Sequence, residues 1–296
     1  MVRVLMVDLL VERETFGHGG NQEVVRPFAA AGDVELLLVT PQMQSFEAGK
    51  KAEAGEVPLS EEDVPHWDDD FPFWQSTTVE LEGRTVSFRR IVMPMVENDL
   101  DMANWLDSIA VDAVVCSGSR RNVSMWEDWM APTASLVRAS ANAGRPTLGI
   151  CFGHQLLCHA LGATIERADS LSSGIWDLDF TDIGVDDELL TSHVSDDSCV
   201  AGLFTHQDHV MSVPESCSLL CSTSHNGVTA VRVLSEDGEP LPSWGIQFHP
   251  EAARARIERA HEWGHISDEE LASFKGEHDG ASILSSFATV VGRYQA

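Results

Sequence analysis

The stretch GRPTLGICFGHQLLCHALG at residues 144–162 decides the fold and carries the first candidate for chemistry. Residues 146–150 form an apolar run of strand length, and residues 153–161 place apolar side chains at helical spacing. We therefore predict a short buried strand followed at once by a helix. Cys151 stands at the junction, with glycines two residues before it and two after it. These glycines permit a sharp turn that lifts the cysteine side chain above the sheet edge.

A cysteine at such a turn has two possible roles. The N–H groups at the start of a helix favour a thiolate and can stabilise a developing oxyanion, which suits a nucleophile. A buried structural cysteine is the alternative, and Cys158 on the same predicted helix fits that description. The pattern G-x-C-x-G does not by itself distinguish the two roles.

A second motif near the C-terminal end favours the nucleophile. Residues 243–248, SWGIQF, are typical of a buried strand, and His249, Pro250 and Glu251 follow directly. A cysteine nucleophile needs an imidazole that takes its proton, and the imidazole needs a group that fixes its tautomer and orientation. His249 and Glu251 leave the strand end on the same side, and Pro250 stiffens the link between them.

The two motifs together resemble the class I glutamine amidotransferase family, which uses a Cys-His-Glu triad. GICFGHQLL and WGIQFHPE carry the resemblance, which covers residues 1–10 and 110–251 in the family's order. It implies a flavodoxin-like glutaminase fold, an α/β architecture with a doubly wound, mostly parallel sheet flanked by helices. It also implies Cys151 as the nucleophile, His249 as the base and Glu251 as the residue that orients the base.

The turn at residues 117–121, SGSRR, departs from the family pattern. The family usually carries a Gly-Gly-Pro-like turn here, whose backbone N–H supplies half of the oxyanion hole. A backbone donor survives a change of side chain, so we expect Gly118 or Ser119 to supply one donor and Phe152 the other. The departure resembles stand-alone members and plant gamma-glutamyl peptidases more than members fused to a synthetase.

The resemblance also indicates which residues hold the substrate. Gln155 matches the family's glutamine four residues after the nucleophile. Residues 204–210, FTHQDHV, resemble a Ser-His-x-Asp-x-Val stretch whose backbone lies along the α-amino and α-carboxylate end of the substrate. Gln207 and Asp208 are therefore the other candidates. We expect a bound or structural role for His206, because another histidine already has the position of the base.

These assignments imply an enzyme that cleaves the γ-glutamyl amide of glutamine, or of a γ-glutamyl compound, through a cysteine thioester. The reaction releases ammonia and needs no cofactor. Two alternatives stay open: a glutaminase subunit that delivers ammonia to a separate synthetase such as GMP synthetase, and a catalytically idle regulatory or binding subunit. The complete Cys, His and Glu set argues against the idle subunit. The sequence shows no ATP-pyrophosphatase signature, so we do not expect the chain itself to activate an acceptor.

Composition excludes several classes of partner. The 296 residues carry a formal net charge of −28, with 47 acidic residues against 19 basic ones. So acidic a surface repels nucleic acid and anionic membranes, and we expect neither as a partner. Acidic excess with few lysines is typical of proteins in concentrated salt, where screening weakens self-repulsion. We therefore predict a halophilic protein, with an ordinary acidic enzyme as the alternative.

The six cysteines show no C-x-x-C pair and no regular spacing. We expect no signal peptide, and no apolar run approaches the length of a membrane span. We therefore predict a cytoplasmic protein with reduced cysteines.

We predict one domain over residues 1–296, with an insertion at about 44–97 and a C-terminal helical extension at about 252–296. Within the insertion, Asp68, Asp69 and Asp70 are more typical of a solvated acidic run than of a cation site. Residues 77–92 alternate around Glu82-Gly83 as in a β-hairpin. The other predicted elements are strands over 2–8, 34–40, 112–116, 228–234 and 244–248, a strand that starts at 163–166, and helices over 21–31, 99–109, 126–143 and 281–294.

One motif points to a different chemistry. Residues 261–265, HEWGH, match the zinc-protease pattern H-E-x-x-H, which places two histidines on one face of a helix. Gly264 weakens that helix, and no third ligand stands out downstream. We therefore expect no metal site.

Overall fold

The computed structural model describes residues 1–9, 21–44, 77–190, 200–252, 257–258, 261–262, 267–273 and 278–294. The strands of its main sheet are β1 (Val2–Val7), β2 (Val34–Val39), β3 (Thr77–Leu81), β4 (Arg84–Arg90), β5 (Ala113–Cys116), β6 (Thr147–Ile150), β8 (Asp179–Phe180), β10 (Cys217–Thr223), β11 (Asn226–Leu234) and β12 (Pro240–Ile246). A second sheet contains β7 (Ile165–Asp177) and β9 (Ala201–Val210). The helices are α1 (Asn21–Ala31), α3 (Asp99–Ser108), α4 (Met130–Asn142), α5 (Phe152–Ala160), α7 (Asp268–Ser273) and α8 (Gly280–Tyr294).

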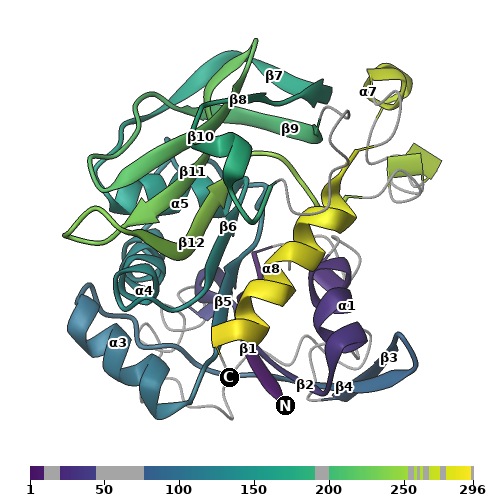
Figure 1. Ribbon diagram of the computed structural model, residues 1–296. Coiled ribbons are helices and arrows are strands. Elements are labelled where there is room, and N and C mark those ends of the chain that lie inside the picture. The colour runs from purple at the N-terminus through teal and green to yellow at the C-terminus, as the bar shows by residue number, and fades with distance from the viewer. Residues whose placement is uncertain are drawn as a thin grey trace, which may run out of the picture.

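The main sheet runs in the order β3-β4-β2-β1-β5-β6-β12-β11-β10-β8 (Figure 1). The strands from β4 to β12 in this order are parallel, and antiparallel strands extend both ends. The predicted α/β class with a mostly parallel sheet is confirmed. Gly149 of β6 pairs with Gly245 of β12, so the residues that follow these two strands meet at one edge of the sheet.

Helices cover both faces of this sheet (Figure 1). Alternate residues of β5 face opposite layers, because successive side chains of a strand point to opposite sides. Val115 joins the core under α1 and α8, whereas Val114 joins the core under α3, α4 and α5. Buried on both faces, the central strands read as continuous apolar runs in the sequence.

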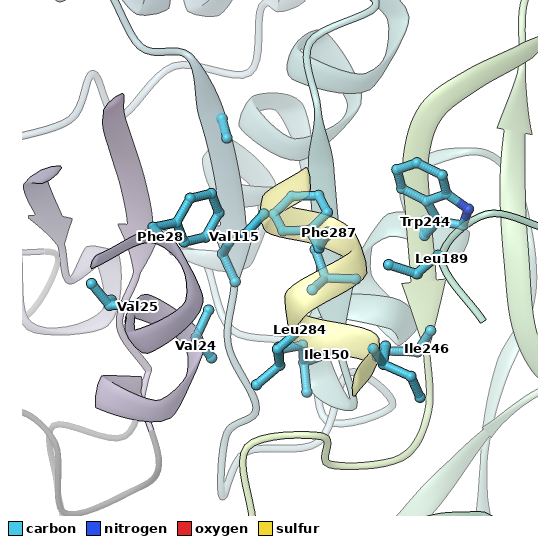
Figure 2. Packing of buried hydrophobic residues seen from close by; sticks show 14 of the residues in the cluster. Val24, Val25, Phe28, Val115, Ile150, Leu189, Trp244, Ile246, Leu284 and Phe287 are labelled. Carbon is cyan, nitrogen blue, oxygen red and sulfur yellow. The ribbon is translucent and has the colours of Figure 1, made fainter. Parts of the chain in front are cut away.

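The final helix α8, which was predicted over residues 281–294, packs back on the sheet. Its Phe287 lies between Phe28 of α1 and Trp244 of β12, with ring centroids 6.0 and 6.3 Å away (Figure 2). All three side chains are buried. The C-terminal helix therefore closes the core above strands from both halves of the chain.

The predicted hairpin is present and belongs to the main sheet. Glu82 and Gly83 both have positive φ, which is the geometry of a two-residue type I′ turn. β4 pairs in parallel with β2, so the later part of the segment expected as an insertion forms one edge of the sheet. Residues 45–76, which include the acidic run at Asp68, Asp69 and Asp70, lie outside the described residues.

Several elements differ from the prediction. The strand predicted to start at residues 163–166 is β7, which continues to Asp177; most of its side chains are exposed or half-buried, so no apolar pattern marks its length. β8, β9 and β10 were not predicted as strands, and β12 covers residues 240–246 instead of 244–248. The helix expected from Trp126 begins at Met130, because the Asp208 carboxylate accepts hydrogen bonds from the backbone N–H and Oγ of Ser124 at 2.8 and 2.7 Å. These bonds hold the preceding residues in a turn.

The C-terminal extension is described in part and contains α7 and α8. Across the described ranges, none of the helices combines the length and the apolar character that a membrane crossing requires.

Candidate active site

Cys151 occupies a strained turn between β6 and α5. Its φ of 50° and ψ of −100° make it one of three non-glycine residues with positive φ in the described part of the chain. Such a conformation costs about 1–3 kcal/mol and persists only when the surrounding structure enforces it. Its backbone N–H donates to the carbonyl of Ile246 at 2.8 Å, which ties the turn to β12.

Close backbone packing enforces this turn. A Cβ on Gly149 would lie 2.5 Å from the carbonyl oxygen of Gly153, and a Cβ on Gly153 would lie 2.2 Å from that of Cys116. Real Cβ atoms do not approach a carbonyl oxygen so closely, because atoms in a protein interior are already in van der Waals contact. The two glycines flanking Cys151 are therefore required by contact with their neighbours, while Cys151 itself adopts the positive φ.

His249 and Glu251 follow β12 and reach the same edge of the sheet. Nδ1 of His249 lies 2.8 Å from Oε1 of Glu251, and both side chains are largely buried. Burial by itself lowers the pKa of His249, but the nearby Cys151 and the Glu251 carboxylate outweigh it and raise that pKa well above its ordinary value. Such an imidazole holds a proton readily and can pass it to a leaving group.

Gly118, which follows β5, completes this cluster. A Cβ there would lie 2.9 Å from Cε1 of His249 and 3.8 Å from Cβ of Cys151. The structure therefore brings Gly118, Cys151 and His249 together from the ends of three neighbouring strands. On another side, the Cys151 Sγ lies 3.9 Å from the carbonyl oxygen of Thr205 in β9.

The predicted oxyanion donors belong to residues next to Cys151 and Gly118 in the chain. Phe152 is the first residue of α5, so its N–H has no partner within the helix. Ser117 Oγ donates to the carbonyl oxygen of Gly118 at 3.0 Å and accepts from the N–H of Leu9 at 3.1 Å. Because a trans peptide directs its N–H opposite to its carbonyl, these bonds also fix the direction of the Ser119 N–H.

The three residues predicted to hold substrate all bond to the protein. Gln155 donates from Nε2 to the carbonyl oxygen of Asp208 at 2.9 Å and to Oε1 of Gln247 at 3.2 Å. The Asp208 carboxylate accepts the two hydrogen bonds from Ser124. Gln207 accepts from Arg167 at 2.7 Å and donates to the carbonyl oxygen of Ala168 at 2.9 Å. Together these bonds fix the backbone of β9 beside the thiol.

Sequence reasoning missed the surroundings of His206. This residue is buried next to His209 and His225, with ring centroids 4.8 and 5.8 Å away. Burial and the neighbouring histidines lower the pKa of His206 to about 2, so the ring is neutral. Ser124 and Arg167, which hold Asp208 and Gln207, were also missed. No local pattern marks any of these contacts, because they join segments far apart in the sequence.

The other described cysteines are structural. Cys158 is fully buried, as predicted, and burial raises its pKa well above the ordinary value. Burial also raises the pKa of Cys116 and Cys217 to about 12. All five cysteines within the described ranges are free.

Among the residues that the structure places, no three His, Cys, Asp or Glu side chains are grouped to hold a metal ion. Nε2 of His261 lies 2.6 Å from Oδ1 of Asp268. Trp263, Gly264 and His265 of the H-E-x-x-H motif lie outside the described residues.

Solved structures of glutamine amidotransferases share this fold. One from Thermotoga maritima superposes with a TM-score of 0.55 at 15% identity, over 98% of this chain and 97% of that chain. One from Methylobacillus flagellatus gives a TM-score of 0.53 at 13% identity, over 99% and 93%. At these identities the likeness concerns the fold alone.

Sequence comparison is more specific. Gamma-glutamyl peptidase 3 from Arabidopsis thaliana is 33% identical over 158 residues, which are 52% of this chain and 57% of that protein. One of the subunits of the glutamine-hydrolysing GMP synthase from Methanocaldococcus jannaschii is 33% identical over 114 residues, 38% of this chain and 54% of that protein. The chain thus spans little more than half the length of either relative. The profile described as Glutamine amidotransferase class-I matches residues 78–260, more than half of the chain. The chain belongs to the class I glutamine amidotransferase family.

Proposed function

We propose that this chain hydrolyses a γ-glutamyl amide through a thioester on Cys151. One observation carries the proposal: the cysteine sits at a strained strand-to-helix turn beside His249, which Glu251 holds at 2.8 Å. A nucleophile, a base and an orienting carboxylate in this order are the parts that covalent acyl transfer needs.

In the first half of the reaction, the proton of the Cys151 thiol passes to His249, and the sulfur attacks the side-chain carbonyl carbon of the γ-glutamyl group. The C–S bond forms, and the carbonyl oxygen becomes an oxyanion that the N–H groups of Phe152 and Ser119, or of Gly118, stabilise. His249 gives its proton to the nitrogen, the C–N bond breaks, and ammonia or an amine leaves. The raised pKa of His249 is consistent with this acid role.

In the second half, water attacks the thioester. His249 takes a proton from the water, the C–S bond breaks, and the γ-carboxylate leaves with Cys151 restored. Glu251 keeps the imidazole oriented through both halves by accepting from Nδ1. Gln207, which is half-buried, can contact the substrate directly. Gln155 and Asp208 are buried, and they act by fixing the β9 backbone along which the substrate lies.

The test compares substitutions of two buried cysteines: Cys151, which precedes α5, and Cys158, which lies within it. Cys151→Ala should lower the hydrolysis of glutamine and of γ-glutamyl peptides by about a thousandfold or more, because triad members act as a unit. Cys158→Ala is the matched control and should retain activity. Ammonia and glutamate release are measured for each purified protein. If Cys151→Ala hydrolyses every γ-glutamyl substrate as fast as the parent, the assignment of the nucleophile is wrong.

A second candidate is a glutaminase subunit that passes ammonia to a separate synthetase. The similarity to one of the GMP synthase subunits favours it, whereas the Gly118-Ser119-Arg120 turn favours a stand-alone hydrolase. We expect the isolated chain to turn over a γ-glutamyl substrate unaided at ~1 s⁻¹ or above. Near-zero turnover that a single co-purifying protein from the source lysate restores many-fold would decide for the second candidate.

A further inference from the structure

β9 carries a buried imidazole that the proposed mechanism does not use. His206 is 4% exposed, and neither of its ring nitrogens has a hydrogen-bond partner among the described residues. Nε2 of His225 and Nδ2 of Asn226 are likewise buried and unpartnered there. The ring of His209 lies against that of His206, with the centroids 4.8 Å apart. We call these four residues the histidine cluster.

The hydrogen bonds that the cluster makes determine which of its unpartnered atoms are donors and which are acceptors. Oγ1 of Thr223 accepts from the backbone N–H of Asn226 at 3.2 Å and lies 2.9 Å from Nδ1 of His225. The threonine hydroxyl can then donate to Nδ1, which leaves the His225 proton on Nε2. Oδ1 of Asn226 accepts from the N–H of Val228, so its Nδ2 is a donor. The ring of His206 lies 5.8 Å from that of His225, and in its neutral form it adds one donor and one acceptor. The unpartnered atoms of the cluster are therefore three donors and one acceptor.

This set of atoms matches water better than any ion. A buried polar atom left unpaired destabilises the fold, and a buried water typically satisfies about two to four such atoms. A cation would meet three N–H donors. An anion would leave the His206 acceptor unmatched and would have to enter a chain with a net charge of −28. Water donates and accepts, so it satisfies both kinds of atom.

We propose that the histidine cluster binds one or two buried water molecules, and that His206 is thereby a positioning residue for the active site. The neighbouring carbonyl of Thr205 lies 3.9 Å from the Cys151 Sγ, and the carbonyl of Asp208 accepts from Gln155. Water held by His206 supports the strand segment between these two carbonyls. The positioning role rests on the proposed hydrolase function, but the water site does not.

A crystal structure of the full chain at high resolution tests the water site. We expect density for water within about 3.2 Å of a His206 ring nitrogen and of Asn226 Nδ2. The proposal is overturned if the cluster is dry, or if the His206 nitrogens bond directly to protein. It is also overturned if crystals grown in bromide give an anomalous peak there, because the occupant would then be an anion.

Kinetics test the positioning role with two variants of one residue. His206→Phe keeps a ring but loses both nitrogens, and we expect kcat/KM to fall about tenfold, the equivalent of one lost hydrogen bond, mainly through KM. His206→Gln offers a donor and an acceptor and should restore most of the loss. If Phe matches the parent, or if Gln is no better than Phe, His206 does not act through water. If Phe fails to fold, the Gln variant and the density decide. A parent without turnover would instead contradict the proposed function and leave the crystallographic test intact.

Discussion

The thiol of Cys151 lies between two walls that are built in different ways. The wall at β5, β6 and α5 is made of backbone packed against backbone, with two glycines where a Cβ would come within 2.2–2.5 Å of a carbonyl oxygen. The wall at β9 is held by side-chain hydrogen bonds of Gln155 and Asp208, and it contains the buried imidazole of His206. The difference shows that the β5, β6 and α5 wall has no room for an added side-chain atom at its two glycines. The β9 wall depends instead on polar contacts that single substitutions can remove one at a time.

The largest effect should come from adding a single methyl group to the first wall. Gly153→Ala places Cβ 2.2 Å from the carbonyl oxygen of Cys116. Overpacking of this kind costs about 3 kcal/mol or more, against a gain of about 1 kcal/mol from better helix propensity. Urea denaturation measures the loss, and Gly227→Ala, which has open space around its Cβ, is the control. A Gly153→Ala protein as stable as the parent would contradict the packing of this wall.

Gly118→Ala should impair activity more than stability. Its Cβ would lie 2.9 Å from Cε1 of His249, and the imidazole can yield by moving away from Cys151. A displacement of about 1 Å from productive geometry costs about a hundredfold in rate. We expect kcat/KM for γ-glutamyl hydrolysis to fall by about that factor, with the melting temperature nearly unchanged. Parent-like kinetics would show that His249 does not have to stay where the structure places it.

In the β9 wall, the contribution of His206 to the free energy of unfolding should fall at acid pH. Burial and nearby histidines lower the pKa of folded His206 to about 2, whereas an unfolded histidine has a pKa near ~6.5. The unfolded state therefore binds the proton first, and the contribution of neutral His206 to stability is complete above pH ~6.5 and is lost as the pH falls. Between pH ~7 and ~5.5 the parent should lose about 1 kcal/mol more unfolding free energy than His206→Phe.

Urea titrations at both pH values measure that difference. The other histidines near His206 titrate in the parent and in the variant, so their contributions largely cancel; these are His154, His209, His225 and His249. Equal acid sensitivity of the two proteins would mean that His206 is protonated in the folded state.

The smallest effect should come from salt, which should raise the melting temperature without depending on either wall. The net charge of −28 produces a long-range repulsion, with a Debye length of about 30 Å at 0.01 M salt and about 3 Å at 1 M. We expect the melting temperature to rise by a few degrees, about 1 kcal/mol, from dilute buffer to molar KCl, and equally in the parent and in Gly118→Ala. A melting temperature that stays constant or falls with added salt would contradict the prediction of a halophilic protein.

The first wall could be predicted from sequence. For the second, the family resemblance indicated Gln155, Gln207 and Asp208 but not the contacts that hold them. The strand, the turn and the helix around Cys151 are contiguous, and their glycines and apolar spacing are visible in one line of residues. The strand before His249 is equally local. By contrast, the contacts of the second wall join distant segments. Asp208 bonds to Ser124, 84 residues away in the sequence, and Gln207 bonds to Arg167, 40 residues away. A mostly exposed strand such as β7 also gives no apolar alternation, so its pairing with β9 and the buried position of His206 stayed hidden.

The parallel pairing of β6 with β12 also has a consequence for the newborn chain. It joins residues roughly a hundred positions apart, and contacts of such long sequence separation form slowly during folding. As a ribosome releases the chain, Cys151 emerges long before His249 and Glu251 exist to serve it. Cys151, the proposed nucleophile, is therefore synthesised before its proposed partners. Only when β12 inserts between β6 and β11 does His249 reach Cys151, so premature termination products would carry the cysteine without the proposed base.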